Sequence, residues 1–209
     1  MIDYSLTSMI ITGVLLGAGS GITPGPLNAL IISESLKSGK NAGIKVAITP
    51  LITDVLVIII SMIILGELAQ INSFLTILTF IGGAFITYLG IRDLFLTPSL
   101  KLNSENSGNP FIKGIITNIF TPHPFIFWIT IGAPILKKSS EISVINSISF
   151  IIGFYLLLVG FKVALALFTG KIRRFFEGKR YIVTIKVLGA LLILLGVLLF
   201  YEGFATFFG

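Results

Sequence analysis

Long apolar runs alternate with short polar stretches along the whole chain. The apolar blocks cover residues 5–35, 44–65, 71–95, 111–136, 143–168 and 182–206. Each block is long enough to cross the hydrocarbon core of a bilayer, which takes about 20 residues of helix. Because lipid offers no hydrogen-bond partner to the backbone, segments of this kind must be helical. The pattern therefore predicts an all-α integral membrane protein with six transmembrane helices.

Polar joints that contain glycine or proline separate the blocks, as expected for the ends of transmembrane helices. The longest joint runs from residue 97 to residue 110 and divides the chain near its middle. We therefore expect one transmembrane domain made of an N-terminal unit (about 1–96) and a C-terminal unit (about 111–209), connected by a loop at 97–110. The blocks fill most of the chain and leave no room for a soluble catalytic domain.

Lysine and arginine residues are concentrated at alternate joints. The second and fourth joints hold only Lys137 and Lys138. The first, third and fifth joints, with the adjoining helix ends, hold Lys37, Lys40, Lys45, Arg92, Lys101, Lys113, Lys171, Arg173, Arg174, Lys179 and Arg180. Because positive charge is retained on the cytoplasmic side, this distribution predicts that the odd-numbered joints are cytoplasmic and both termini outside.

Two similar proline-containing segments occur 98 residues apart, Thr-Pro-Gly-Pro at 23–26 and Thr-Pro-His-Pro at 121–124. The first segment lies in the first predicted helix and the second lies in the fourth, so the two copies would cross the membrane in opposite senses. Many secondary transporters consist of inverted halves with broken helices at matching positions. We therefore predict two inverted three-helix repeats in which helices 1 and 4 are broken.

The composition agrees with a membrane protein. Of the 209 residues, 55% are hydrophobic and 11% are charged, and the mean hydropathy is +1.03. A soluble domain carries roughly a quarter charged residues, so these charges could not cover a water-soluble globule. The N-terminus lacks the basic segment of a cleaved signal peptide, and the first block is therefore expected to be retained.

Charge and cysteine content exclude several classes of function. The net charge of +6 fits basic cytoplasmic joints better than a nucleic-acid partner, because no soluble module presents a basic face. The chain has no cysteine, which excludes disulfides, thiol redox chemistry and cysteine-bound metals. Glycine-rich phosphate loops and paired histidines are also missing from the sequence, so no cofactor and no metal are expected.

The prolines of the two segments point to a site within the membrane. Each proline removes a helical hydrogen bond and displaces the carbonyl four residues earlier. At membrane depth, such a break must face protein or a water-filled cavity. The helix that restarts after the break offers unpaired N–H groups and a positive dipole end, which suit a carboxylate. A structural kink is the alternative, but the repetition of the motif favours a site.

Asp54 is an ionisable residue within the second block. A carboxylate at this depth is costly and should face the interior of the helix bundle. It would either balance a substrate ammonium group or carry a proton during transport. The alternative is a structural partner for Lys162 or for a backbone N–H. We favour a functional role because Pro50 loosens the same helix one turn away.

Three further polar residues adjoin the breaks. His123, the only histidine, would take up protons near neutral pH or satisfy a freed carbonyl, and the sequence supports both interpretations equally. Asn28 and Asn118 each lie one turn from a proline. They would bind a polar substrate or form hydrogen bonds between helices, and the sequence supports both interpretations equally.

The remaining intramembrane residues favour structural roles. Glu34 would be an entrance residue or an ordinary interfacial charge, and the second interpretation is favoured. Lys162 and Lys186 are best interpreted as side chains that snorkel to the membrane surface. Close contact between the third and sixth helices is expected at Gly82, Gly83, Gly90, Gly189 and Gly196, since small residues let membrane helices approach.

The motifs resemble those of the LysE/RhtB family of amino-acid exporters. The sequence Gly-Ile-Thr-Pro-Gly-Pro is similar to the family signature in the first helix, and the fifth helix is featureless in comparison. The resemblance covers residues 21–26, 39–43, Asp54, 81–90, Gly114, Asn118 and 121–124.

The resemblance implies a multi-pass exporter of amino acids such as lysine, arginine, threonine or homoserine in the cytoplasmic membrane of a prokaryote, driven by the proton gradient. This sequence departs from the family pattern in three ways. Thr49 and Thr53 replace small glycines, and Thr121 replaces the usual asparagine. Phe127 stands where some exporters of basic amino acids carry a second aspartate. The missing carboxylate argues for a neutral or apolar solute.

We therefore predict a secondary active transporter that exports an amino acid or similar small zwitterion by alternating access, coupled to protons. Asp54 and His123 are the predicted proton-coupling residues. The predicted substrate-binding residues are Thr23, Pro24, Gly25, Pro26, Asn28, Asp54, Asn118, Thr121, Pro122 and His123. The expected partners are the solute, protons and the lipid bilayer, and the sequence is compatible with a homo-oligomer.

Two other functions are compatible with parts of the pattern. A transporter of another solute, such as a metal cation, would need several carboxylates at the midplane, where the sequence offers only Asp54. An integral membrane enzyme is the third hypothesis, and the lack of cysteine and of clustered histidines and acids argues against it.

Overall fold

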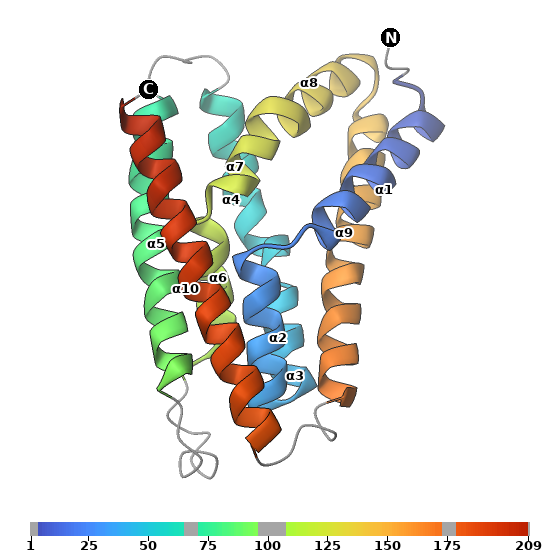
Figure 1. Cartoon of the computed structure of the whole chain (residues 1–209). Coiled ribbons are helices and arrows are strands. Elements are labelled where there is room, and N and C mark those ends of the chain that lie inside the picture. Colours follow the sequence, from blue (N-terminus) through green and yellow to red (C-terminus); the bar gives the residue numbers. More distant parts are fainter. Residues whose placement is uncertain (1–3, 65–70, 96–107, 173–178, 209) are drawn as a thin grey trace.

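The structure, a computed structural model, describes residues 4–64, 71–95, 108–172 and 179–208 (Figure 1). All elements within these ranges are helical. They are α1 (Leu6–Ile22), α2 (Pro26–Ser38), α3 (Lys40–Ala47), α4 (Pro50–Ile64), α5 (Ile71–Leu94), α6 (Pro110–Ile119), α7 (Pro122–Phe127), the π-helical turn η4 (Trp128–Gly132), α8 (Ala133–Ile142), α9 (Val144–Ile172) and α10 (Lys179–Phe208). Most of the predicted loop at 97–110 lies outside the described residues.

Several of these elements are long and apolar enough to cross a membrane. Lys40–Ile63, Val144–Ile172 and Ile182–Ala205 each qualify as a single span. Two bent pairs qualify if each pair is counted as one span, which makes three to five candidate spans in the described chain. The remaining predicted helix, the third (71–95), corresponds to α5, whose 24 residues extend over about 36 Å at 1.5 Å per residue.

Both predicted helix breaks are present. The axes of α1 and α2 meet at 62°, and those of α6 and the segment Pro122–Ile142 meet at 51°. In each pair, proline occupies the beginning of the second helix, where its missing N–H costs no hydrogen bond. The prediction that helices 1 and 4 are broken is therefore confirmed.

Two pairs of long helices flank a central group (Figure 1). α1 packs along α9, and α5 packs along α10, while α2, α3 and α6 contact one another between these pairs. α1 begins and α10 ends at the same end of the bundle, whereas α2 and α5 end at the opposite end. The two breaks therefore lie in the interior of the bundle, away from both ends.

Glycines bring α5 and α10 into close contact. A Cβ atom on Gly90 would lie 2.6 Å from the carbonyl oxygen of Gly189, and one on Gly189 would lie 2.8 Å from that of Gly90. Gly83 and Gly196 face each other in the same reciprocal way. The predicted contact between the third and sixth helices is therefore confirmed at these four positions, whereas Gly82 faces the end of α6.

This contact predicts a specific loss of stability. Gly90→Ala should lower the free energy of unfolding by about 1–3 kcal/mol, because the added methyl group must displace the facing backbone. Gly160→Ala in α9 is the matched control, since a Cβ atom there meets nothing within 4 Å. Thermal unfolding of both variants in one detergent measures the difference. Equal melting temperatures for the two variants would contradict the packing described here.

Candidate functional site

A cavity of about 260 Å³ lies where the two helix breaks meet. Sites for drug-sized ligands measure about 300–1,000 Å³, so this cavity suits a small solute. Pro122 is not among the lining residues. The other predicted substrate-binding residues do line it: Thr23, Pro24, Gly25, Pro26, Asn28, Asp54, Asn118, Thr121 and His123.

The first break separates α1 from α2. Gly25 precedes α2 in an extended conformation, and no side chain caps the N-terminus of that helix. The Thr23 hydroxyl donates a hydrogen bond to the carbonyl of Gly19 at 2.7 Å. The side-chain amide of Asn28 donates to the carbonyls of Gly21 (3.3 Å) and Thr23 (2.9 Å). Asn28 therefore satisfies carbonyls at the end of α1, and its own oxygen remains available to a donor.

The second break separates α6 from α7, and the π-helical turn η4 follows directly after the six residues of α7. The Thr121 hydroxyl donates a hydrogen bond to the carbonyl of Thr117, as Thr23 does to Gly19 at the first break. Trp128, the first residue of η4, lines the cavity. π-helical turns are frequent at functional sites, and this one borders the cavity.

Asp54 lies on α4 at the edge of the cavity and is only 4% exposed. The amide of Asn118 donates to Oδ1 of Asp54 at 2.8 Å and to Oγ1 of Thr53 at 2.6 Å. The Tyr155 hydroxyl donates to Oδ2 of Asp54 at 3.2 Å. Asp54 thus connects α4 to α6 and α9. A buried carboxylate needs such partners because burial without them is costly.

The two threonines that depart from the family pattern lie where α3 joins α4. Pro50 begins α4 and cannot donate a backbone hydrogen bond. The Thr49 hydroxyl donates to the carbonyl of Val46 at 2.8 Å, and the Thr53 hydroxyl donates to the carbonyl of Thr49 at 3.0 Å. Glycine has no hydroxyl, so these bonds exist only because threonine replaces the glycine of the family pattern at both positions. They lie on the turn that precedes Asp54.

Lys162 is the second charged residue in the lining. Its side chain is buried, and Nζ donates a hydrogen bond to Oδ1 of Asn28 at 2.7 Å. α9 continues for ten residues beyond Lys162, which corresponds to about 15 Å of helix. The prediction that this lysine snorkels to the membrane surface is therefore wrong, since the side chain turns into the cavity.

The positions of Lys162, Tyr155 and Thr53 at the site are not predicted by the sequence. For Lys162, one signal was present, because Phe154, Leu158 and Lys162 recur every four residues and therefore share one face of α9. All three line the cavity. No comparable signal marks Tyr155 or Thr53, whose roles depend on the position of Asp54 and Asn118 on other helices.

Aromatic side chains form the apolar wall of the cavity. The rings of Phe127 and Phe154 stack with centroids 5.0 Å apart and an interplanar angle of 16°. Trp128 meets Phe154 edge-on at 5.4 Å. Leu27 and Leu158 complete this part of the lining. This part of the lining is therefore an apolar surface, and Phe127 contributes a ring to it.

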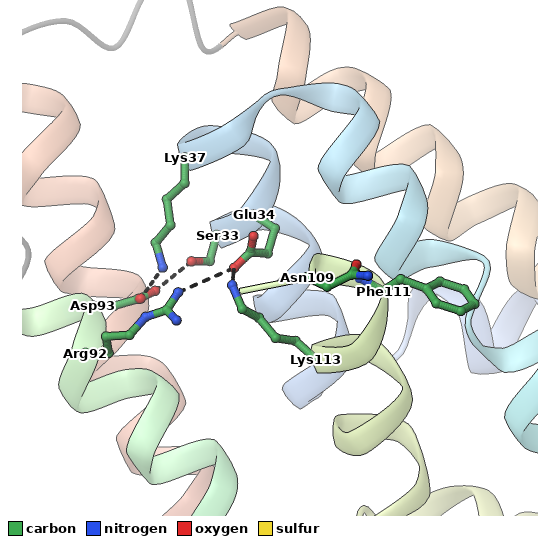
Figure 2. Close-up of polar contacts among 8 residues, drawn as sticks. All are labelled: Ser33, Glu34, Lys37, Arg92, Asp93, Asn109, Phe111 and Lys113. Atoms are coloured by element: carbon green, nitrogen blue, oxygen red, sulfur yellow. Dashed lines mark hydrogen bonds and ion pairs between the residues drawn. The ribbon is translucent and has the colours of Figure 1, made fainter. Parts of the chain in front are cut away.

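A group of charged and polar side chains lies farther along α2 (Figure 2). Glu34 pairs with Lys113 at 2.7 Å and with Arg92 at 4.0 Å. Asp93 pairs with Lys37 and accepts a hydrogen bond from Ser33 at 2.6 Å. This set is termed the charged cluster: Ser33, Glu34, Lys37, Arg92, Asp93 and Lys113.

The charged cluster connects the two predicted units. Glu34 lies on α2 in the N-terminal unit, and Lys113 lies on α6 in the C-terminal unit. Glu34 has 0% exposure, so its interpretation as an interfacial charge is wrong. Removing one partner of a buried ion pair costs about 3–5 kcal/mol because the other charge stays unpaired. The pair therefore links α2 to α6 in this conformation.

Comparison with known families matches residues 20–203 to the family described as LysE type translocator. The matched range covers most of the chain, including both breaks, Asp54, Lys162 and the charged cluster. No curated protein and no solved structure gives a significant match.

Proposed function

Because the chain belongs to the LysE type translocator family, whose members are membrane transporters and not enzymes, we propose that it exports an amino acid or a similar small zwitterion. Family membership implies export of a small solute across the membrane. The class of solute, the coupling to protons and the sidedness are parts of the proposal.

One observation carries the proposal, namely a carboxylate and an ammonium group in the lining of the same small cavity. Asp54 and Lys162 form no ion pair with each other in the described part of the chain, and each is hydrogen-bonded to an asparagine. A zwitterion offers the complementary pair of charges. A metal cation or a purely cationic solute would be repelled by Lys162, which argues against the alternative of a metal transporter.

Alternating access is the mechanism that we propose. Glu34 lies eight residues beyond Pro26 on α2, which places the charged cluster about 12 Å farther along the helix from the first break. In this conformation, the cluster holds α2, α5 and α6 together between the cavity and the end of the bundle where α2 ends. Release of the cluster would open the cavity toward that end.

The proposed motion is a movement of the N-terminal unit against the C-terminal unit. Each unit begins with a bent helix pair, and the reciprocal contact of Gly90 with Gly189 is the kind expected between helices related by a two-fold axis. These features support, as a proposal, the inverted repeat that the sequence predicts.

Sidedness and coupling complete the proposal. The end of the bundle that carries Lys37 and Arg92 would face the cytoplasm, and both termini would lie outside. Asp54 would release a proton when the substrate ammonium group binds and recover one when it leaves. His123, which is exposed and lines the cavity, is the second candidate for proton transfer.

Ligand-induced stabilisation of the purified protein tests the class of solute. A ligand that binds only the folded state raises the melting temperature. We expect neutral amino acids with apolar side chains to raise it, and simple amines or divalent cations to leave it unchanged. If divalent cations alone stabilised the protein, the proposed solute class would be wrong.

A further inference from the structure

We infer that Lys162 binds the carboxylate of the exported solute. Together with the aromatic wall of the cavity, this role makes the substrate class α-amino acids with an uncharged, apolar side chain. The inference rests on the proposed function and adds to it a residue, a role and a constraint on the ligand. It assigns the carboxylate to a side chain of α9, the helix that the sequence left featureless.

The position of Lys162 relative to α2 is the first argument. Its Nζ contacts Asn28, which lies in the first turn of α2. The N-terminus of a helix carries partial positive charge, so a lysine there is unfavourable unless an anion is present. The ammonium group and the uncapped end of α2 therefore produce a region of positive potential within the cavity. A bound carboxylate would compensate both.

The unused hydrogen-bonding capacity of Lys162 is the second argument. An ammonium group has three N–H donors, and one of them is directed to Oδ1 of Asn28. Within the described chain, no ion pair with Lys162 is formed. The side chain is buried, with 6% exposure, and it lines a cavity of about 260 Å³. A buried ammonium group that lines a cavity and has unused N–H donors is suited to binding an anion.

The arrangement of the whole lining is the third argument. Asp54 on α4 and Lys162 on α9 both line the cavity, and the stacked rings of Phe127 and Phe154 form its wall. An α-amino acid carries its ammonium and carboxylate groups on one carbon, so a single small ligand can face both charges. Its side chain would then lie against the aromatic wall, where a further charge would be left unpaired.

The competing explanation is that Lys162 serves only as a distant counter-charge for Asp54 and as the donor to Asn28. This explanation predicts that removal of the lysine charge affects all ligands equally. The inference predicts a selective effect on ligands that carry a carboxylate.

A matched set of three ligands separates the two explanations: valine, valinamide, which lacks the carboxylate, and isovalerate, which lacks the amine. Their affinities are measured on the purified wild-type protein and on Lys162→Gln, which keeps a donor for Asn28 but removes the charge. Lys162→Arg keeps the charge. Lys138→Met, an exposed position on α8, is the control for loss of a lysine elsewhere.

We expect wild-type protein to bind valine at least about tenfold more tightly than valinamide. In Lys162→Gln, valine affinity should fall about 30-fold or more, as when one partner of a buried charge pair is lost, while valinamide affinity changes little. Lys162→Arg and Lys138→Met should retain the preference for valine.

Two results would overturn the inference while leaving the proposed function intact. One is an unchanged preference for valine over valinamide in Lys162→Gln. The other is equal binding of valine and valinamide by the wild-type protein. This measurement does not depend on the folding of any variant. If the wild-type protein bound none of a panel of zwitterions, the proposed function itself would fail.

Discussion

Asp54→Asn is expected to abolish export. Asp54 is the only carboxylate that the described residues contribute to the cavity lining, so the substrate ammonium group would lose its partner. Removing one member of a buried charge pair costs about 2–5 kcal/mol. That corresponds to a loss of roughly 30- to 4,000-fold in affinity. Asparagine keeps the shape of the side chain and an oxygen that can accept from Asn118, so the fold should persist.

The measurement is uptake of a labelled neutral amino acid into inverted membrane vesicles, with Glu141→Gln as the control. Glu141 is an exposed carboxylate on α8, and its neutralisation should leave transport unchanged. Wild-type transport rates in Asp54→Asn would refute the role of this carboxylate. If transport persisted but no longer depended on the imposed pH gradient, Asp54 would carry the proton and not bind the ammonium group.

A cross-link between α2 and α6 is expected to stop export completely and reversibly. The chain contains no cysteine, so Glu34→Cys with Lys113→Cys provides a unique pair of thiols. Both partners of a buried ion pair are removed together, which is tolerated better than the loss of one. Before cross-linking, we expect transport to continue. Treatment with a short, reducible bifunctional thiol reagent should abolish it, and reduction should restore it.

The matched control pair lies within one unit. Lys37→Cys with Asp93→Cys connects α2 to α5, both of which belong to the N-terminal unit. If the two units move as bodies, this cross-link should leave transport largely intact. Inhibition by both cross-links would mean that α2 moves against α5, and activity with the Glu34–Lys113 pair locked would mean that the charged cluster does not separate during transport.

The helix breaks and most of the cavity lining could be predicted from sequence because their cause is local. A proline removes a backbone hydrogen bond and displaces a carbonyl, and each of the two breaks contains two prolines within three residues. The breaks at 23–26 and 121–124 follow directly from this rule. Asp54 could be assigned to the interior because a carboxylate facing lipid is too costly.

The roles of Lys162 and Glu34 could not be predicted because they depend on distant segments. Lys162 meets Asn28 across 134 residues of chain, and Lys113 meets Glu34 across 79. A hydropathy pattern gives the depth of a charged residue but not the direction of its side chain. A long lysine near a helix end snorkels by default. The packing of α9 against α2 directs the side chain of Lys162 into the cavity instead.

The central claim is that one cavity, between two broken helices, carries a small zwitterion across the membrane. Uptake of labelled neutral amino acids into inverted vesicles with an acidic interior tests it most directly. The account predicts saturable accumulation that requires the wild-type protein, is competed by unlabelled zwitterions but not by their amides, and is lost in Asp54→Asn. Failure of every amino acid to accumulate, or equal accumulation with Asp54→Asn, would contradict it.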